Sequence, residues 1–158
     1  MIAIFHEIRS LHNVGSMFRT ADAAGITKIY LSGITPGPRD RFNRPETRFT
    51  KVSLGAENFV VWEKVSSTPE LLIKLKKIGY RVVAIEQNPS SIPYQTIKFS
   101  KVELARVVLV VGNEVLGLPK EILDLANDVV EIPMFGQKES LNVGVAFGIV
   151  AFRLALPK

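Results

Sequence analysis

Three polar clusters carry most of the residue types in this chain that could do chemistry, and each lies beside an apolar run. They read HNVGSMFRTADAAG (12–25), VVGNEVLGLP (110–119) and EIPMFGQKESLNVGVA (131–146). Their hydroxyl, amide, carboxylate and guanidinium groups are the kind that orient substrates in active sites. Each cluster also has a plain structural use, because Asn13 and Asn142 are good helix caps and Glu114 could begin a turn. Spacing alone leaves both interpretations open.

Several familiar catalytic patterns are missing from the sequence. There is no GxxxxGK[ST] loop, no GxGxxG after the first apolar run, and no His-containing triad with a nucleophile elbow. The chain has no Cys, which excludes disulfides, cysteine nucleophiles and Cys-ligated zinc and is compatible with a reducing cytoplasm. Since His6 and His12 are too few for a His-rich metal site, we expect no metal.

The elements that must position these clusters alternate between strands and helices along the whole chain. Strands are expected at 1–5, 28–32, 59–63, 81–85, 106–111 and 129–132, and helices at about 11–24, 47–57, 68–79, 119–126 and 141–156. Unbroken apolar runs such as VVLVV mark strands that are covered on both faces, as in a parallel sheet. The pattern predicts a single α/β domain with a mainly parallel sheet and helices on both faces.

Ligands of open parallel sheets bind beyond the carboxyl ends of the strands. That rule selects four places in this chain, Ser32-Gly33, Glu86-Gln87, 112–114 and Pro133-Met134. Three of them are polar or glycine-rich turns that follow apolar runs directly. The pattern predicts a ligand site there without naming the ligand.

The last expected helix is apolar on almost every side. Ser140 is a good N-cap, which would start the helix at Leu141. A stripe of small residues with helical spacing lets another backbone approach closely, and its members are Gly144, Gly148, Ala151 and Ala155. Sixteen residues interrupted by Asn and Arg are short for a membrane span of ~20. We expect this helix to be buried in the core or between subunits.

The net charge of +5 favours a polyanionic partner, although many proteins are mildly basic for other reasons. More than half of this excess lies in one loop-like segment, 36–51, where five basic residues face two acidic ones.

In order, spacing and residue identity the three clusters resemble the SPOUT superfamily of methyltransferases, in its SpoU or TrmH branch of RNA ribose 2′-O-methyltransferases. The first family motif is matched by Asn13, Arg19 and Gly25. The second, a GNExxGLP-type turn, is matched by Gly112, Asn113, Glu114, Gly117, Leu118 and Pro119. The third, IPM followed by SLNV, is matched by Ile132, Pro133, Met134, Ser140, Leu141, Asn142 and Val143. The similarity runs from about Phe5 to Phe152.

The resemblance implies a C-terminal trefoil knot, a tight homodimer, and S-adenosyl-L-methionine bound by the knot loops. A knot does not follow from general fold rules, because threaded chains are nearly absent from proteins. The cofactor-binding residues that the resemblance implies are Ile85, Glu86, Gly112, Asn113, Gly117, Leu118, Ile132, Met134, Ser140, Leu141 and Val143.

The implied activity is methylation of a ribose 2′-hydroxyl in tRNA or rRNA. The implied catalytic residues, by the same resemblance, are Arg19, Asn13, Glu114, Ser140 and Asn142. The last four would orient the ribose, the flanking phosphate and Arg19. Family analogy describes Arg19 as a base, whereas a guanidinium that is always charged fits a phosphate clamp that stabilises the developing alkoxide.

Many family members add an N-terminal RNA-binding domain, which residues 1–158 lack, so we expect this single SPOUT domain to grip RNA itself. The candidate RNA-binding residues are Arg9, Arg39, Arg41, Arg44, Arg48 and Lys51. Phe42 and Phe49 are interleaved with them and would suit base stacking. The alternative is a solvated loop.

Two rival functions come from other classes. One is a knotted dimer that binds RNA without chemistry, and the other is a nucleotide-binding α/β enzyme such as a dehydrogenase, which the missing glycine fingerprint disfavours. The N-terminus MIAIFHEIRS does not look like a signal peptide, and we expect a cytoplasmic protein with no membrane partner.

Overall fold

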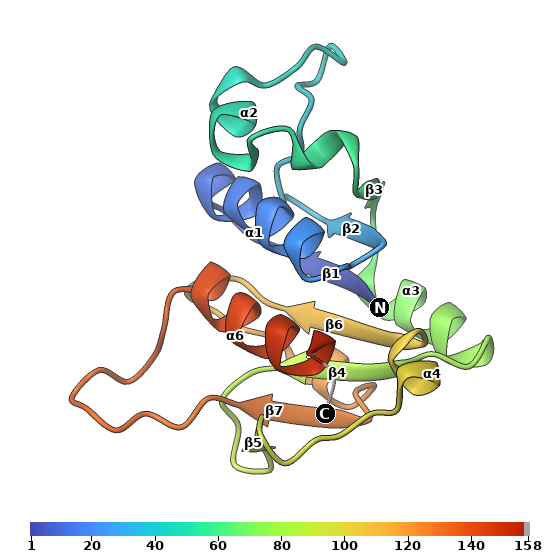
Figure 1. Cartoon of the computed structure of the whole chain (residues 1–158), viewed down its shortest axis with the longest axis vertical. Helices are drawn as coiled ribbons and strands as arrows, with labels where there is room; N and C mark the ends of the chain where they lie inside the picture. The colour runs from blue at the N-terminus through green and yellow to red at the C-terminus, as the bar shows by residue number, and fades with distance from the viewer. Residues whose placement is uncertain (157–158) are drawn as a thin grey trace.

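The computed structural model describes residues 1–156 and joins seven strands in one sheet, in which every neighbouring pair is parallel. The order across the sheet is β3-β2-β1-β6-β4-β7-β5 (Figure 1). The strands are β1 (Ile2–His6), β2 (Lys28–Ser32), β3 (Val61–Val65), β4 (Arg81–Ile85), β5 (Ile92–Pro93), β6 (Val107–Val111) and β7 (Asp128–Glu131). The predicted α/β class with a mainly parallel sheet is confirmed.

Helices cover both faces of the sheet because its central strands are apolar on both sides. In β1, Ala3 and Phe5 pack into one core, and Ile2 and Ile4 pack into the other. The first core also takes residues from α1 (Leu11–Ala23), α2 (Thr47–Ser53) and α6 (Val143–Ala155). The second takes residues from α3 (Thr68–Lys77) and α5 (Lys120–Leu123). This is the two-sided cover that the unbroken apolar run of β6 predicts.

Helices α1 and α6 lie side by side in front of the strands (Figure 1). Gly148 of the small-residue stripe faces α1, since a Cβ placed on it would be in ordinary van der Waals contact with Thr20 Cγ2, at 3.5 Å. Beneath the two helices the ring of Phe5 meets those of Phe18 and Phe147 edge to face, with centroids 6.3 and 5.2 Å apart. One side of α6 is therefore buried in the core, as predicted. Among the described helices, none combines the length and the apolar character that crossing a membrane requires.

The start of α6 corrects the sequence prediction. The helix begins at Val143 and not at Leu141, and its N-cap is Asn142 and not Ser140. Asn142 Oδ1 accepts hydrogen bonds from the backbone N–H groups of Gly144 and Val145, at 2.9 and 3.3 Å. Ser140 stays exposed in the preceding loop. Both residues are good cap types, so their identity did not distinguish them.

Several short elements were not predicted. They are β5 and α4 (Lys101–Leu104), while the one-turn helix η1 (Ala56–Asn58) overlaps the end of the helix expected over 47–57. The helix expected over 47–57 is split because Leu54 and Gly55 have φ of 52° and 89°, which ends α2. The helix expected over 119–126 keeps only the four residues of α5. The trefoil knot remains a prediction.

Candidate active site

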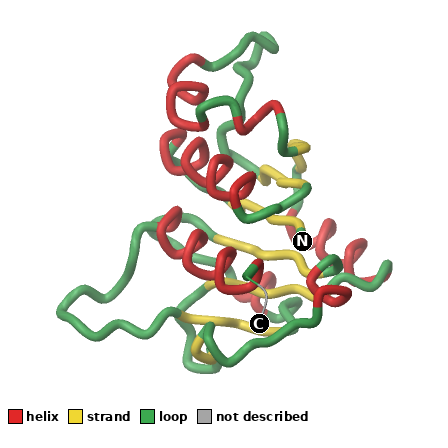
Figure 2. The backbone as a smooth tube through the Cα atoms, viewed as in Figure 1, coloured by secondary structure: helices red, strands yellow, loops and turns green. Residues whose placement is uncertain are grey.

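A cavity of about 350 Å³ opens where the carboxyl ends of β4, β6 and β7 meet the N-terminus of α6. Its volume falls within the range of small-molecule sites. The long β7–α6 loop, green in Figure 2, reaches out beside these strand ends. The wall is formed by Ile85, Glu86, Gln87, Val111, Gly112, Asn113, Glu114, Val115, Gly117, Val130, Glu131, Ile132, Met134, Ser140, Leu141, Asn142, Val143 and Ala146.

The turn after β6 requires glycine at two positions. A Cβ on Gly112 would lie 2.6 Å from the carbonyl carbon and oxygen of Gly117, and Gly117 itself has a φ of 64°. Asn113 holds the turn in place, since its Oδ1 accepts from Val115 N at 2.9 Å and its Nδ2 donates to Glu7 O at 2.7 Å. The backbone of this turn consequently forms part of the cavity wall, with no side chain on Gly112 to fill the space.

Glu86 braces the same turn from the end of β4. One of its carboxylate oxygens accepts from Leu118 N at 2.7 Å, and the other accepts from Gln87 N at 3.0 Å. Leu118 is buried in the core below. Its backbone is thus tied to the cavity through Glu86, although its side chain is not part of the wall.

Glu114 holds the segment that leads into α1 through hydrogen bonds. Its carboxylate accepts from Arg9 N at 2.9 Å, from Ser10 N at 3.1 Å and from Asn13 Nδ2 at 2.9 Å. Burial acts to raise the pKa of Glu114, but these hydrogen bonds together hold its pKa below the usual glutamate value. At neutral pH the group is an ionised hydrogen-bond acceptor, which suits a positioning residue better than a proton-transfer group.

Asn13 links Glu114 to the start of α6. While its Nδ2 donates to Glu114, its Oδ1 accepts from Asn142 Nδ2 at 3.1 Å, and Asn142 Oδ1 caps α6. One continuous hydrogen-bonded chain therefore joins all three sequence clusters. The capping roles and the site roles that the sequence left open are not exclusive, because the cap of α6 is also a link in the network.

The structure brings nearly all of the proposed cofactor residues together. Every one of them lines the cavity except Leu118, and Glu114, Ser140 and Asn142 of the proposed catalytic set line it too. Asn13 reaches it through its bonds to Glu114 and Asn142. Their individual functions stay predictions.

Some wall residues were not predicted, and one predicted place is not in the wall. Val111, Val130 and Ala146 were missed because each lies within an apolar run whose sequence signal is that of the core. Ser32-Gly33 lies elsewhere because β1 separates β2 from β6 in the sheet. The strand-end rule found the right edge of the sheet, but only the strand order decided which ends share a cavity.

Arg19 lies apart from this cavity in its own chain. It is exposed on α1 and is not among the wall residues. Six residues along a helix separate it from Asn13, which is a shift of ~9 Å along the axis and a turn of ~120° around it. The catalytic role that the resemblance implies for Arg19 stays a prediction.

The basic segment 36–51 lies at the upper end of the molecule in Figure 1, where it comprises the loop that leads into α2 and the first five residues of α2. Arg39, Arg41, Arg44, Arg48 and Lys51 are all exposed there. One part of the prediction is wrong, because Phe49 is fully buried and packs edge to face on Phe18 with centroids 5.1 Å apart. Phe49 is a core residue of α2 and does not present its ring to a ligand. Arg9 lies elsewhere, beside Glu114.

This fold and cavity define an α/β protein with a cavity of small-molecule size at the carboxyl edge of a parallel sheet. Over residues 1–152 the chain matches the SpoU rRNA Methylase family, and it belongs to that family. It is 31% identical over 152 residues to the tRNA (guanosine(18)-2′-O)-methyltransferase of Aquifex aeolicus, a match that covers 96% of this chain and 67% of that protein. A 23S rRNA (guanosine(2553)-2′-O)-methyltransferase of Bacillus subtilis is also 31% identical, over 97% of this chain and 57% of that protein. The chain thus spans between about half and two thirds of these relatives.

Solved structures show the same fold. The AdoMet-bound rRNA methyltransferase from Sinorhizobium meliloti superposes with a TM-score of 0.82 and 32% identity, over 96% of this chain and 54% of that one. The A. aeolicus TrmH/SpoU tRNA modifying enzyme superposes with a TM-score of 0.81 and 28% identity, over 98% of this chain and 73% of that one.

Proposed function

We propose that this protein is an RNA methyltransferase that transfers a methyl group from S-adenosylmethionine to a ribose 2′-hydroxyl of tRNA or rRNA. The observation that carries the proposal is the hydrogen-bonded chain through Glu114, Asn13 and Asn142, which joins the three family motifs beside one cavity. Family membership and the named activities of the relatives support it. A cytoplasmic location, where such RNA is accessible, is part of the proposal.

The residues present fit the cofactor that the proposal requires. Ile85, Val130, Ile132 and Leu141 give the cavity an apolar wall for an adenine ring, while the open backbone beside Gly112 offers peptide groups for its polar edge. Bound there, S-adenosylmethionine supplies an electrophilic methyl on a sulfonium centre. The AdoMet-bound S. meliloti relative supports this assignment.

The polar residues beside the cavity act mainly by positioning. In-line attack needs the 2′-hydroxyl to be held close to the methyl donor. Such close placement removes a large part of the activation barrier. Ser140 is exposed at the mouth of the cavity with no hydrogen bond among the described residues, so its hydroxyl is free to contact the ribose. Glu114 and Asn13 fix the start of α1, the helix that carries Arg19. Arg19 offers a planar guanidinium with five N–H donors and no acceptor, so we assign it to the phosphate and the developing alkoxide rather than to proton removal.

A homodimer is part of the proposal, and the outer face of α6 supports it. Within α6 the exposed large apolar side chains are Val145 and Phe152, seven residues apart, and exposed Leu156 follows at the C-cap of the helix. That spacing places them on one side of the helix, opposite the side that is buried in the core. An apolar stripe of this kind on an otherwise packed helix favours a second copy of the chain as its cover.

The proposal is tested by titrating S-adenosylmethionine and S-adenosylhomocysteine into protein whose solution mass is measured in parallel, followed by methyl transfer to total tRNA and rRNA. We expect one site per subunit of a dimer and labelled 2′-O-methyl nucleosides. Arg19→Ala should lower turnover ~10²-fold or more while leaving cofactor affinity nearly unchanged. A folded dimer that binds RNA but neither ligand would replace the proposal with the RNA-binding rival.

A further inference from the structure

Residues 38–46, here called the 38–46 hairpin, form a small closed unit at the tip of the basic segment. Its ends are joined by a hydrogen bond from Glu46 N to Pro38 O at 2.9 Å and by an antiparallel bridge between Arg39 and Pro45. Its turn is closed by a bond from Asn43 N to Asp40 O at 3.0 Å, with Asn43 at a φ of 61°. The tip is therefore an ordered turn, although it is exposed.

Asp40 fixes the backbone of this tip from within. Its Oδ1 accepts from Phe42 N at 2.8 Å and from Arg44 N at 2.9 Å, and its Oδ2 accepts from Arg44 Nε at 2.9 Å. The hydrogen bond from the Arg44 backbone, helped by the Arg44 side chain, holds the pKa of Asp40 below its usual value. The carboxylate stays charged at neutral pH and keeps Arg44 beside Phe42.

Phe42 presents an aromatic ring to solvent between cationic neighbours. The residue is 63% exposed, and the guanidinium carbons of Arg41 and Arg44 lie 4.7 and 5.0 Å from its ring centroid. Both distances are within the range of cation–π attraction. Among the described residues the Arg41 side chain has no hydrogen bond or ion pair, so it can leave the ring for another partner at little cost.

The charge around the ring is positive. Arg44 is paired with Asp40 and Arg48 with Glu46, while Arg41 and Arg39 have no acidic partner among the described residues. Such a surface fits a polyanion. A polyanion of phosphates alone would need only the arginines, whereas the exposed ring adds a flat apolar face that matches a nucleobase.

We propose that Phe42, with Arg41 and Arg44, is a stacking site for an unpaired base of the RNA substrate. A base inside a duplex has both of its faces covered by its neighbours, so the ring selects a loop, bulge or single strand. Arg41 then contacts an adjacent phosphate, and Arg44 stays on the ring. The inference rests on the proposed function, since it takes RNA as the substrate.

The stacked base is not the nucleoside methylated at the same chain's cavity. The 38–46 hairpin follows β2, at the upper end of the molecule in Figure 1, whereas the cavity lies at the ends of β4, β6 and β7. The hairpin thus adds a second point of recognition, which favours RNAs that expose an unpaired base apart from the target nucleoside.

The test compares wild type with Phe42→Ala, Phe42→Leu and Phe42→Trp. Fluorescence anisotropy measures their binding to a single-stranded oligoribonucleotide of about 12 nucleotides and to its duplex. Alanine and leucine should each weaken single-strand binding ~10-fold, since both remove the aromatic face on which a base stacks. Tryptophan should retain binding. The salt dependence should stay unchanged in Phe42→Ala but become shallower in Arg41→Ala, because only the arginine contacts phosphate.

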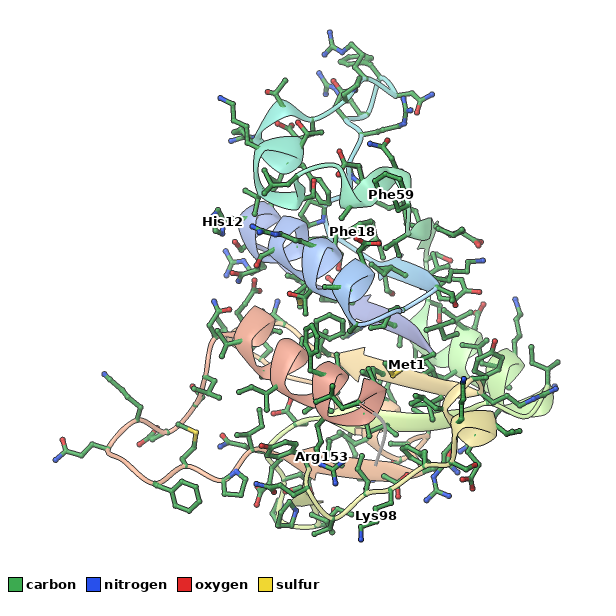
Figure 3. All side chains as sticks on the ribbon, viewed as in Figure 1. Met1, His12, Phe18, Phe59, Lys98 and Arg153 are labelled. Atoms are coloured by element: carbon green, nitrogen blue, oxygen red, sulfur yellow. The ribbon has the colours of Figure 1, made fainter. Side chains whose placement is uncertain are left out.

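Phe59→Ala is the matched control, because Phe59 is 79% exposed but lies beside η1, outside the 38–46 hairpin (Figure 3). It should bind RNA like the wild type, and thermal unfolding checks that all variants fold. Three outcomes would each overturn the inference. Phe42→Ala binds single-stranded RNA as tightly as wild type, or Phe42→Ala and Phe59→Ala lose equal affinity, or wild type binds the duplex as tightly as the single strand. If wild type methylates RNA and Phe42→Ala does so with the same KM, only this inference fails. If wild type binds no S-adenosylmethionine, it is the proposed function that fails.

Discussion

The cavity and the 38–46 hairpin hold their polar groups in opposite ways. Around the cavity, side-chain hydrogen bonds join residues that are far apart in the chain: Asn13 and Glu114 are 101 positions apart, and Asn13 and Asn142 are 129 apart. In the hairpin, Asp40 bonds only to groups within four positions of itself. The geometry of the cavity therefore depends on the whole fold, whereas the shape of the hairpin depends on its own sequence.

This difference indicates how each region should respond to change. A substitution at the cavity end should affect stability and ligand binding together, because the same bonds hold the fold and the wall. A substitution in the hairpin should affect RNA binding alone. Four variants test this contrast, in decreasing order of the effect that we expect.

Gly112→Ala should damage both the fold and the cavity. The added Cβ would lie 2.6 Å from the carbonyl of Gly117, so the turn after β6 must shift. Overpacking of this kind costs about 1–3 kcal/mol of folding free energy, and we expect a melting temperature several degrees lower with loss of S-adenosylmethionine binding by calorimetry. Gly136→Ala is the control, because a Cβ there meets nothing within 4 Å. Full cofactor affinity in Gly112→Ala would contradict our account of the wall.

Asn142→Ala should remove the N-cap of α6 and the link to Asn13 in one step. Loss of an Asn cap typically costs about 1 kcal/mol, which corresponds to a melting temperature ~2–4 °C lower for a domain of this size. Asn142→Asp keeps an oxygen for the cap but loses the donor to Asn13. If Asn142→Asp is as stable as wild type but still transfers methyl groups poorly, the cap stabilises the fold and the bond to Asn13 supports activity. If both variants lose stability and methyl transfer equally, the two contributions are not separate.

Glu114→Gln should give a pH-dependent loss of stability. Because the folded state lowers the pKa of Glu114, its contribution is fully present above the unfolded value of ~4.3 and is lost as the pH falls through the folded value. Wild type should therefore melt at a higher temperature than Glu114→Gln at neutral pH, and the two melting temperatures should converge once the pH falls below the lowered pKa that Glu114 has in the folded protein. If the difference in melting temperature between wild type and Glu114→Gln persists at acid pH, the charge of Glu114 is not what holds Arg9 and Ser10.

Asp40→Ala should have the smallest effect on the fold. It removes only local bonds in the 38–46 hairpin, so the melting temperature should match that of the wild type. The amides of Phe42 and Arg44 should exchange with solvent faster in hydrogen-exchange measurements, and single-strand RNA binding should fall. A clear drop in the melting temperature would mean that the hairpin is not independent of the core.

Most strands and the site motifs could be predicted from sequence because their signals are local. The strands at 28–32 and 81–85 were found with their observed bounds, since each is an apolar run between breakers. The choice between Ser140 and Asn142 as cap failed because both types cap well. Phe49 was assigned to a ligand surface although it is buried, because a Phe in a basic segment gives no local sign of which way its ring faces.

By itself the sequence determined the alternation of strands and helices, the resemblance carried by the three motifs, and the basic, loop-like character of segment 36–51. Tertiary structure alone decided that Glu114, Asn13 and Asn142 form one hydrogen-bonded chain, that β1 keeps the end of β2 away from the cavity, and that Arg19 lies outside the cavity of its own chain. The physical reason is range. Propensities, caps and turns act over a few residues, whereas strand order and contacts across more than a hundred positions exist only after the chain has packed.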